Sequence, residues 1–342
     1  MPLRQKHSER WIMAKRNIIP IFIPFAGCPV KCIYCDQNQI TGVSSTVSGE
    51  DVGRKIAVGL EKCAHQPAEV AFYGGTFTML DIKKQNELLR ALRPFIKSGR
   101  VSAIRLSTRP EKLNEEDFIR LKSFGVTTVE FGIQSVDGRV LEAAGRGISV
   151  EEMDRTVFLA KASGLEVGLQ QMVGLPEDSF EKDLVTARWI ADRGDFVRIY
   201  PTVVFRNTAL YSMYVNGEFK PLSLKEAIER VAQLLDFYDT TSIPVIRAGL
   251  PQMARSAYVA GPYHDNFREF AESFRRLSPI LKKYKDVESV EGSQRAINRL
   301  AGPFGYGRKA LEAVYGPVAF RKRETVEEEL QINGEEHTHA FN

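Results

Sequence analysis

A chain of 342 residues with 43% hydrophobic and 26% charged residues has the composition of a soluble globular protein, which excludes a disordered or fibrous one. Its length exceeds that of an ordinary domain, but barrels of β/α units often reach it, so we expect one barrel with an appended unit. The net charge of +4 is compatible with a polyanionic partner and does not by itself indicate one.

The first apolar run of the chain covers residues 18–25. It is too short and too interrupted by proline to cross a membrane, so we expect no membrane partner. A buried strand of a parallel sheet explains the run, because such strands are apolar on both faces. The four cysteines, three of them within eight residues, suit a metal site in a reducing compartment, and we expect a cytoplasmic protein.

From this run to about residue 245, apolar segments alternate with amphipathic ones, which is typical of repeated βα units around a parallel sheet. We predict strands at residues 19–26, 69–73, 103–107, 128–133, 166–173 and 196–202. We predict helices at residues 52–63, 82–96, 115–124, 150–163, 180–192, 224–238 and 266–284. The expected fold class is α/β, a partial (β/α)6 barrel of the TIM type with a C-terminal helical or mixed extension.

The predicted barrel occupies residues 1–245, and the extension, which we expect to pack on it, residues 246–342. From about residue 324 the sequence is acidic and then polar, so we expect a flexible tail there. Reacting groups in such barrels lie at the carboxyl ends of the strands. The residues that follow each predicted strand are therefore the place to look for a site.

Three cysteines follow the first predicted strand with the spacing Cys-x3-Cys-x2-Cys, at Cys28, Cys32 and Cys35. Thiolates this close in one loop would converge on a single inorganic centre, and three ligands would leave one iron of a [4Fe–4S] cluster open. Zinc is the competing metal, but a structural zinc site normally has four protein ligands. Cys63 would be a fourth ligand, but it falls near the end of a predicted helix, where we expect it to be a packing residue.

Further candidates follow the later strands. The paired glycines Gly74 and Gly75, with Thr76, would let the backbone come close to a ligand. Ser107 ends the third predicted strand, and Gln134 the fourth. The guanidinium of Arg146 suits a carboxylate, which it meets with two parallel hydrogen bonds.

The three cysteines, with Tyr34 before the last of them, resemble the signature of the radical S-adenosylmethionine (SAM) superfamily. The resemblance implies a [4Fe–4S] cluster whose open iron binds SAM, and reductive cleavage of SAM to a 5′-deoxyadenosyl radical. It also implies an external electron donor such as flavodoxin or ferredoxin. By the same resemblance, Tyr34 lies beside the adenine, and Gly74 and Gly75 bind the methionine amino group.

The spacing of Gln134 and Arg146 is similar to that in the oxygen-independent coproporphyrinogen oxidases. In that family the glutamine binds the SAM ribose and the arginine binds the methionine carboxylate. Gln170 stands where those oxidases carry an aspartate, so the sequence departs from their pattern at this ribose contact. This resemblance leaves open a radical SAM reaction on a small-molecule or porphyrin-type substrate.

Several stretches resemble the radical SAM half of the Elongator catalytic subunit, which modifies wobble uridines of transfer RNA (tRNA). They include residues 74–77, 108–110, 129–135, 159–164, 198–204, 245–247 and 264–269. Too few residues follow position 270 for the acetyltransferase domain of that family, so we expect radical chemistry on tRNA or another RNA-linked group without it. Basic residues at 275–276, 282–285 and 321–323 either contact phosphates, with Tyr263 or Phe267 stacked on a base, or belong to a solvated basic helix; the sequence leaves both open. The alternative to an enzyme is a zinc-binding or electron-transfer protein that uses the same thiolates.

Overall fold

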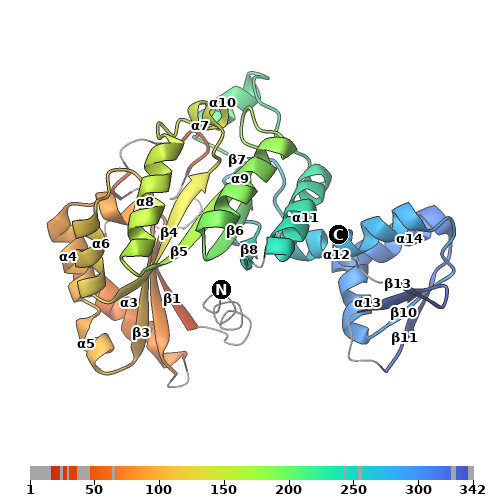
Figure 1. The fold of residues 1–342 in the computed structure, drawn as a ribbon, viewed down its shortest axis with the longest axis horizontal. Helices are drawn as coiled ribbons and strands as arrows, with labels where there is room; N and C mark the ends of the chain where they lie inside the picture. The colour runs from red at the N-terminus through yellow and green to blue at the C-terminus, as the bar shows by residue number, and fades with distance from the viewer. Residues whose placement is uncertain are drawn as a thin grey trace.

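The computed structural model describes residues 17–23, 26–28, 31–36, 47–63, 66–241, 243–252, 256–324 and 329–337. Within them, the barrel is a seven-stranded parallel sheet that does not close, with the strand order β1-β2-β3-β4-β5-β6-β8 (Figure 1). The strands are β1 (Asn17–Phe22), β2 (Ala68–Tyr73), β3 (Val101–Thr108), β4 (Val126–Gln134), β5 (Glu166–Val173), β6 (Phe196–Pro201) and β8 (Val245–Ala248). Each of the six predicted strands is present, and β8 adds a seventh at the end of the predicted barrel. The predicted α/β partial barrel with its extension is confirmed.

Helices cover the outer face of the large sheet (Figure 1). The helices of the first 245 residues are α3 (Gly49–Glu61), α4 (Ile82–Arg90), α5 (Arg93–Lys97), α6 (Glu115–Ser123), α7 (Gly138–Ala143), α8 (Val150–Ala162), α9 (Phe180–Arg193), α10 (Ala209–Val215) and α11 (Leu224–Thr241), with the short 3-10 helix η1 (Phe77–Met79). The prediction of a single helix at 82–96 is wrong, because the chain turns between α4 and α5. Pro94 lies in the first turn of α5, where its missing N–H leaves no hydrogen bond unmade. No helix among the described residues is long and apolar enough to cross a membrane.

The two faces of the large sheet differ in chemistry. Side chains alternate along each strand, and the face under the helices is apolar, with Phe72, Leu106, Phe131 and Ile199 in the main core. The inner face is polar. It carries Glu69, Tyr73, Arg105, Ser107, Glu130, Gln170, Arg198 and Tyr200. An open barrel with a polar inner face is suited to receive a polar substrate.

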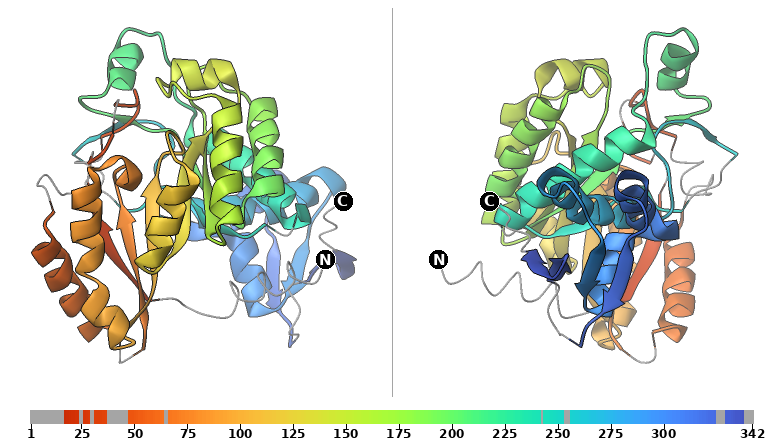
Figure 2. Two further views of the ribbon diagram at one scale, coloured as in Figure 1. Left: turned by 60° about the vertical axis from the view of Figure 1, so that its left-hand side comes forward. Right: turned by 90° about the vertical axis from the view of Figure 1, so that its right-hand side faces the viewer.

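The extension forms a second, smaller unit that α12 (Phe267–Lys283) connects to the barrel (Figure 1). In the right-hand view of Figure 2 its sheet lies in front of the barrel. The unit contains β10 (Ser289–Gly292), α13 (Gln294–Ala301), η2 (Pro303–Gly305), α14 (Tyr306–Tyr315), β11 (Ala319–Lys322), β12 (Leu330–Ile332) and β13 (Glu335–His337). Outside this unit, the two short strands β7 (Val204–Phe205) and β9 (Tyr258–Ala260) pair with each other. The main core includes Phe270 and Ala271, and a separate core begins at Leu277. The domain division at residue 245 stays a prediction.

The tail predicted from residue 324 is not without structure. Strands β12 and β13 form an antiparallel hairpin around Asn333 and Gly334, which both have positive φ angles. Asn-Gly is the residue pair that such two-residue turns favour. Leu330 and Ile332 are buried in the small core, so two apolar side chains anchor this hairpin. The expectation of a frayed tail is therefore wrong for residues 330–337, and residues 325–328 and 338–342 lie outside the described part.

Two aspartates near the start of α9 make the stability of the barrel depend on pH. Burial raises the pKa of Asp183 well above its ordinary value, the carboxylate of Asp178 raises it further, and Arg230, 3.4 Å away, acts in the opposite direction. A carboxyl group whose pKa is higher in the folded chain stabilises the fold fully below its unfolded pKa, about 4. This contribution is lost as the pH rises through the folded value.

Replacing Asp183 with asparagine removes the ionisable group. We therefore expect the free energy of unfolding of Asp183→Asn, relative to the unsubstituted protein, to increase as the pH rises above about 4. Urea unfolding at a series of pH values measures this difference. Asp192→Asn in the same helix is the control, because the Asp192 side chain is 79% exposed. A pH-independent difference for Asp183→Asn would contradict the prediction.

Candidate functional site

The cysteine loop follows β1 at the carboxyl edge of the sheet and lies against the chain that follows β2. The Thr76 N–H donates to the Ala26 carbonyl at 2.9 Å. Gly75 has no room for a side chain, because a Cβ there would lie 2.4 Å from the carbonyl oxygen of Ile23. Gly27 is equally confined, since its Cβ would lie 2.2 Å from the Thr76 carbonyl oxygen. Gly75, one of the two glycines that the sequence suggested for ligand contact, thus lets two loops come together, and the contact of Gly74 and Gly75 with a ligand stays a prediction.

The three thiols of this loop influence one another. Cys28 Sγ and Thr76 Oγ1 lie 3.2 Å apart, and the Cys35 N–H donates to the Cys32 carbonyl at 3.1 Å. Burial raises the pKa of Cys35 to about 12, and the negative charges of Cys32 and Cys28 add to the effect. A positively charged centre would relieve this repulsion. Among the described residues, no group of three His, Cys, Asp or Glu side chains is arranged around one metal ion, so the cysteine ligand set stays a proposal.

Two arginines reach the sulfur of Cys32. Arg109 follows β3, and its Nη1 lies 3.5 Å from Cys32 Sγ. Arg146 follows α7, and its Nη1 lies 3.7 Å from the same sulfur. Arg109 also donates to Glu111 Oε1 from Nε at 2.6 Å and to the Arg146 carbonyl from Nη2 at 2.6 Å. Since Arg109, Arg146 and Glu111 are all at least 93% buried, the two guanidinium groups act on Cys32 with little screening by water.

The two candidate glutamines lie together on neighbouring strands. Gln170 on β5 donates from Nε2 to Gln134 Oε1 on β4 at 3.0 Å. Gln134 has a φ of 71°, a left-handed conformation that is unusual for a residue other than glycine and often marks a functional position. Gly132 makes room for its amide, because a Cβ there would lie 2.6 Å from Gln134 Nε2. Arg146 donates to the carbonyl of the same Gly132. The pair of glutamines and the pair of arginines therefore lie next to each other at this glycine.

Tyr34, within the cysteine loop, packs against an apolar cluster that includes Val140, Met172 and Leu175. Burial raises the pKa of Tyr34 well above its ordinary value, although the positive charge of Arg146 acts in the opposite direction. Its ring thus lies in an apolar setting beside the cysteines, which suits contact with a planar group. Ser107 is half-buried near the end of β3, and its role stays a prediction.

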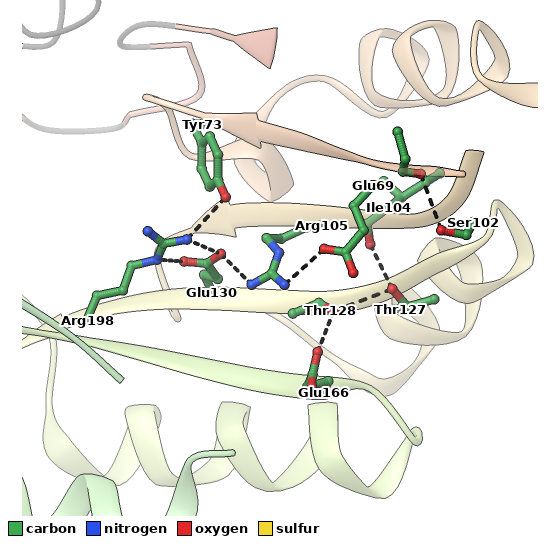
Figure 3. Close-up of polar contacts among 11 residues, drawn as sticks. Glu69, Tyr73, Ser102, Ile104, Arg105, Thr127, Thr128, Glu130, Glu166 and Arg198 are labelled. Atoms are coloured by element: carbon green, nitrogen blue, oxygen red, sulfur yellow. Dashed lines mark hydrogen bonds and ion pairs between the residues drawn. The ribbon is translucent and has the colours of Figure 1, made fainter. Parts of the chain in front are cut away.

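A charged network covers the inner face of the sheet (Figure 3). Arg105 donates to Glu69 at 3.1 Å and to Glu130 at 2.9 Å, and Arg198 donates to Glu130 at 2.5 Å and to the Tyr73 hydroxyl at 3.2 Å. Burial alone would raise the pKa of Glu130, but Arg198 and Arg105 outweigh burial and lower it. Glu130, Arg105 and Arg198 therefore stay charged inside the barrel.

Sequence reasoning missed Arg109 and Glu111 as site residues, and it missed the charged network. A signal for Arg109 was present, since a cation directly follows the third strand at its carboxyl end. The strands that pack apolar side chains under the helices also carry the charged residues Glu69, Arg105 and Glu130. Their partners were not apparent because pairing across strands depends on register.

Several residues suggested for nucleic-acid contact are internal. Phe267 is 2% exposed and packs under Gly249, so it cannot stack on a base. Arg275 is bound by Asp236 at 2.7 Å and by Asp239, and Arg276 is bound by Glu272 at 3.2 Å. Arg275 therefore joins α12 to α11 of the barrel, and Arg276 forms an ion pair within α12.

The sequence matches two known protein families. The pattern of the Radical SAM superfamily matches residues 22–190, and that of the Radical_SAM C-terminal domain matches residues 194–278. The chain belongs to the radical SAM superfamily. It is therefore an enzyme, which rules against the alternative of a zinc-binding or electron-transfer protein. Membership in the radical SAM superfamily implies a [4Fe–4S] cluster and SAM as cofactors.

This radical SAM enzyme is similar to a protein named for tRNA modification and to a protein named for the Elongator complex. It is 32% identical over 275 residues to the tRNA uridine(34) acetyltransferase of Methanocaldococcus jannaschii, a match covering 68% of this chain and 50% of that protein. It is 28% identical over 270 residues to Elongator complex protein 3 of Bos taurus, covering 72% and 48%. The solved structure of Elp3 from Methanocaldococcus infernus has a TM-score of 0.60 and 24% identity, covering 79% and 64%. The chain spans about half the length of the curated relatives it matches.

The residues at the site fit the two cofactors. Arg146 Nε is buried and finds no acceptor within the described part of the chain. A buried donor without a partner is costly, and a carboxylate such as that of SAM would supply the missing acceptor. The crowded thiols fit a centre that accepts negative ligands.

Proposed function

We propose that this radical SAM enzyme modifies tRNA in the cytoplasm. In this proposal Cys28, Cys32 and Cys35 bind the cluster. The residues that contact SAM are Tyr34, Gly74, Gly75, Thr76, Ser107, Gln134, Arg146 and Gln170. The observation that carries the proposal is Arg146, which contacts Cys32 with one nitrogen and keeps a buried donor without an acceptor beside it.

Four of the SAM-contact residues have tasks that follow from their contacts. When bound, the cluster and SAM supply a 5′-deoxyadenosyl radical, using one electron from an external donor such as flavodoxin or ferredoxin. Arg146 orients the methionine carboxylate, and the paired amides of Gln134 and Gln170 present donors and acceptors to the ribose hydroxyls. Tyr34 covers the adenine and excludes water. The polar inner face then receives the substrate opposite SAM.

Transfer RNA is the substrate that the relatives and the surface of the extension support. Both curated relatives cited above carry names tied to tRNA modification or Elongator. The extension exposes Lys282, Lys283, Lys285, Lys322 and Arg323, which can follow a phosphate backbone. Because the chain spans half of these relatives, the group that is transferred is not carried over from their names.

Two experiments test the two halves of the proposal. Protein reconstituted anaerobically with iron and sulfide, reduced, and mixed with SAM is expected to release 5′-deoxyadenosine. A fully loaded protein that releases none would contradict the radical chemistry. Mass spectrometry of total tRNA nucleosides from a strain that lacks the gene is expected to show a missing or accumulated uridine derivative. Unchanged tRNA with an altered metabolite would favour a small-molecule substrate.

A further inference from the structure

Arg109 is fixed on several sides in a way that a simple ion pair does not require. Glu111 accepts hydrogen bonds from its Nε and Nη2, and the carbonyl of Arg146 accepts from Nη2. These contacts leave Nη1 directed at Cys32 Sγ, 3.5 Å away. Arg109 is 6% exposed, so the orientation of its planar group is set by the protein and not by water.

The two arginines at Cys32 differ in what else they offer. Arg146 keeps a buried Nε without an acceptor in the described part of the chain, which suits a ligand. The other guanidinium, that of Arg109, already uses Nε and Nη2 within the protein. Its remaining donor, Nη1, faces the sulfur of Cys32. The arrangement of Arg109 therefore serves the cysteine and not the substrate.

We propose that Arg109, anchored by Glu111, is a positioning residue that donates a hydrogen bond to the Cys32 sulfur and raises the reduction potential of the cluster. The inference rests on the proposed function, which makes Cys32 a cluster ligand. It adds a task for two residues that the SAM contacts do not use.

The direction of the effect follows from charge. A cluster gains a negative charge when it is reduced, and a cation that donates to a ligand sulfur stabilises the reduced form. Burial strengthens this interaction because little water screens it. Loss of Arg109 therefore makes the cluster harder to reduce, and its potential becomes more negative.

The test is an anaerobic redox titration of the reconstituted holoenzyme, monitored by the electron paramagnetic resonance signal of the reduced cluster. In Arg109→Gln, we expect the ratio of reduced to oxidised cluster at a fixed potential to fall about tenfold, the same factor as the smallest typical loss of metal affinity or activity when a group that hydrogen-bonds to a metal ligand is removed. For a one-electron couple this is a shift of about 59 mV to more negative potential. Arg54→Gln, a surface arginine that is 65% exposed, is expected to leave the potential unchanged.

A second variant separates the hydrogen bond from the charge. Arg109→Lys keeps the charge but cannot reproduce the planar fork that binds Glu111, so its potential should lie below that of the unsubstituted enzyme. An unchanged potential in loaded Arg109→Gln, or in Arg109→Lys, would overturn the inference. If Arg109→Gln retains no cluster, Arg109→Lys decides alone. The lack of any [4Fe–4S] signal in the unsubstituted enzyme would instead contradict the proposed function.

Discussion

The Cys32→Ala enzyme is expected to lose the [4Fe–4S] cluster and to release 5′-deoxyadenosine from SAM at least about 100-fold more slowly. A factor of about 100 is the upper end of the loss in metal affinity or activity when a group that hydrogen-bonds to a metal ligand is removed. Loss of a ligand itself should have a larger effect. The substitution also leaves Arg109 and Arg146 without the sulfur that both approach. Iron content after anaerobic reconstitution and the rate of 5′-deoxyadenosine release measure the two effects.

Cys63→Ala is the matched control. Cys63 is buried after α3, and its thiol donates to the Gly59 carbonyl at 3.2 Å, a contact typical of a packing residue. We expect this variant to retain its iron and its SAM cleavage. Full iron content in Cys32→Ala, or loss of iron in Cys63→Ala, would contradict the ligand assignment.

The second large effect is expected at the charged network, where Arg105→Met should lower the free energy of unfolding by about 3–5 kcal/mol. Arg105 is 1% exposed and lies between Glu69 and Glu130 (Figure 3). Its replacement leaves two buried carboxylates with one fewer cation, and Arg198 remains close to Glu130 alone. Urea unfolding monitored by circular dichroism measures the change.

A surface arginine again provides the comparison. Arg54→Met removes an exposed ion pair with Glu50, which should change the unfolding free energy by less than about 1 kcal/mol. The double variant Arg105→Met with Glu69→Gln should recover part of the loss, because one buried charge is removed. An Arg105→Met protein as stable as Arg54→Met would show that the network does not stabilise the barrel.

The sequence alone predicted the parts of this enzyme that depend on local pattern. The alternation of apolar and amphipathic segments gave the six strands of the barrel, and β5 has the predicted limits. The spacing of Cys28, Cys32 and Cys35 indicated the cofactor chemistry, and the superfamily match confirmed it. Both features are local, since they depend on residues a few positions apart.

The missed features depend on contacts between distant residues. Arg109 meets Cys32 across 77 positions, and Arg198 meets Glu130 across 68. The 330–337 hairpin was missed although Asn333 and Gly334 are a strong turn signal, because the acidic composition of the region outweighed it in our prediction. Buried Leu330 and Ile332, together with the pairing of β12 with β10, hold this hairpin on the small core.

The charged network also selects how the strands align. Glu69, Arg105, Glu130 and Arg198 come from four different strands, β2, β3, β4 and β6, and their ion pairs form when these strands have the observed register. A slip of one residue would turn a charged side chain into the apolar layer under the helices. Misaligned barrels are therefore penalised during folding, and the same four residues that line the interior favour one alignment of its strands.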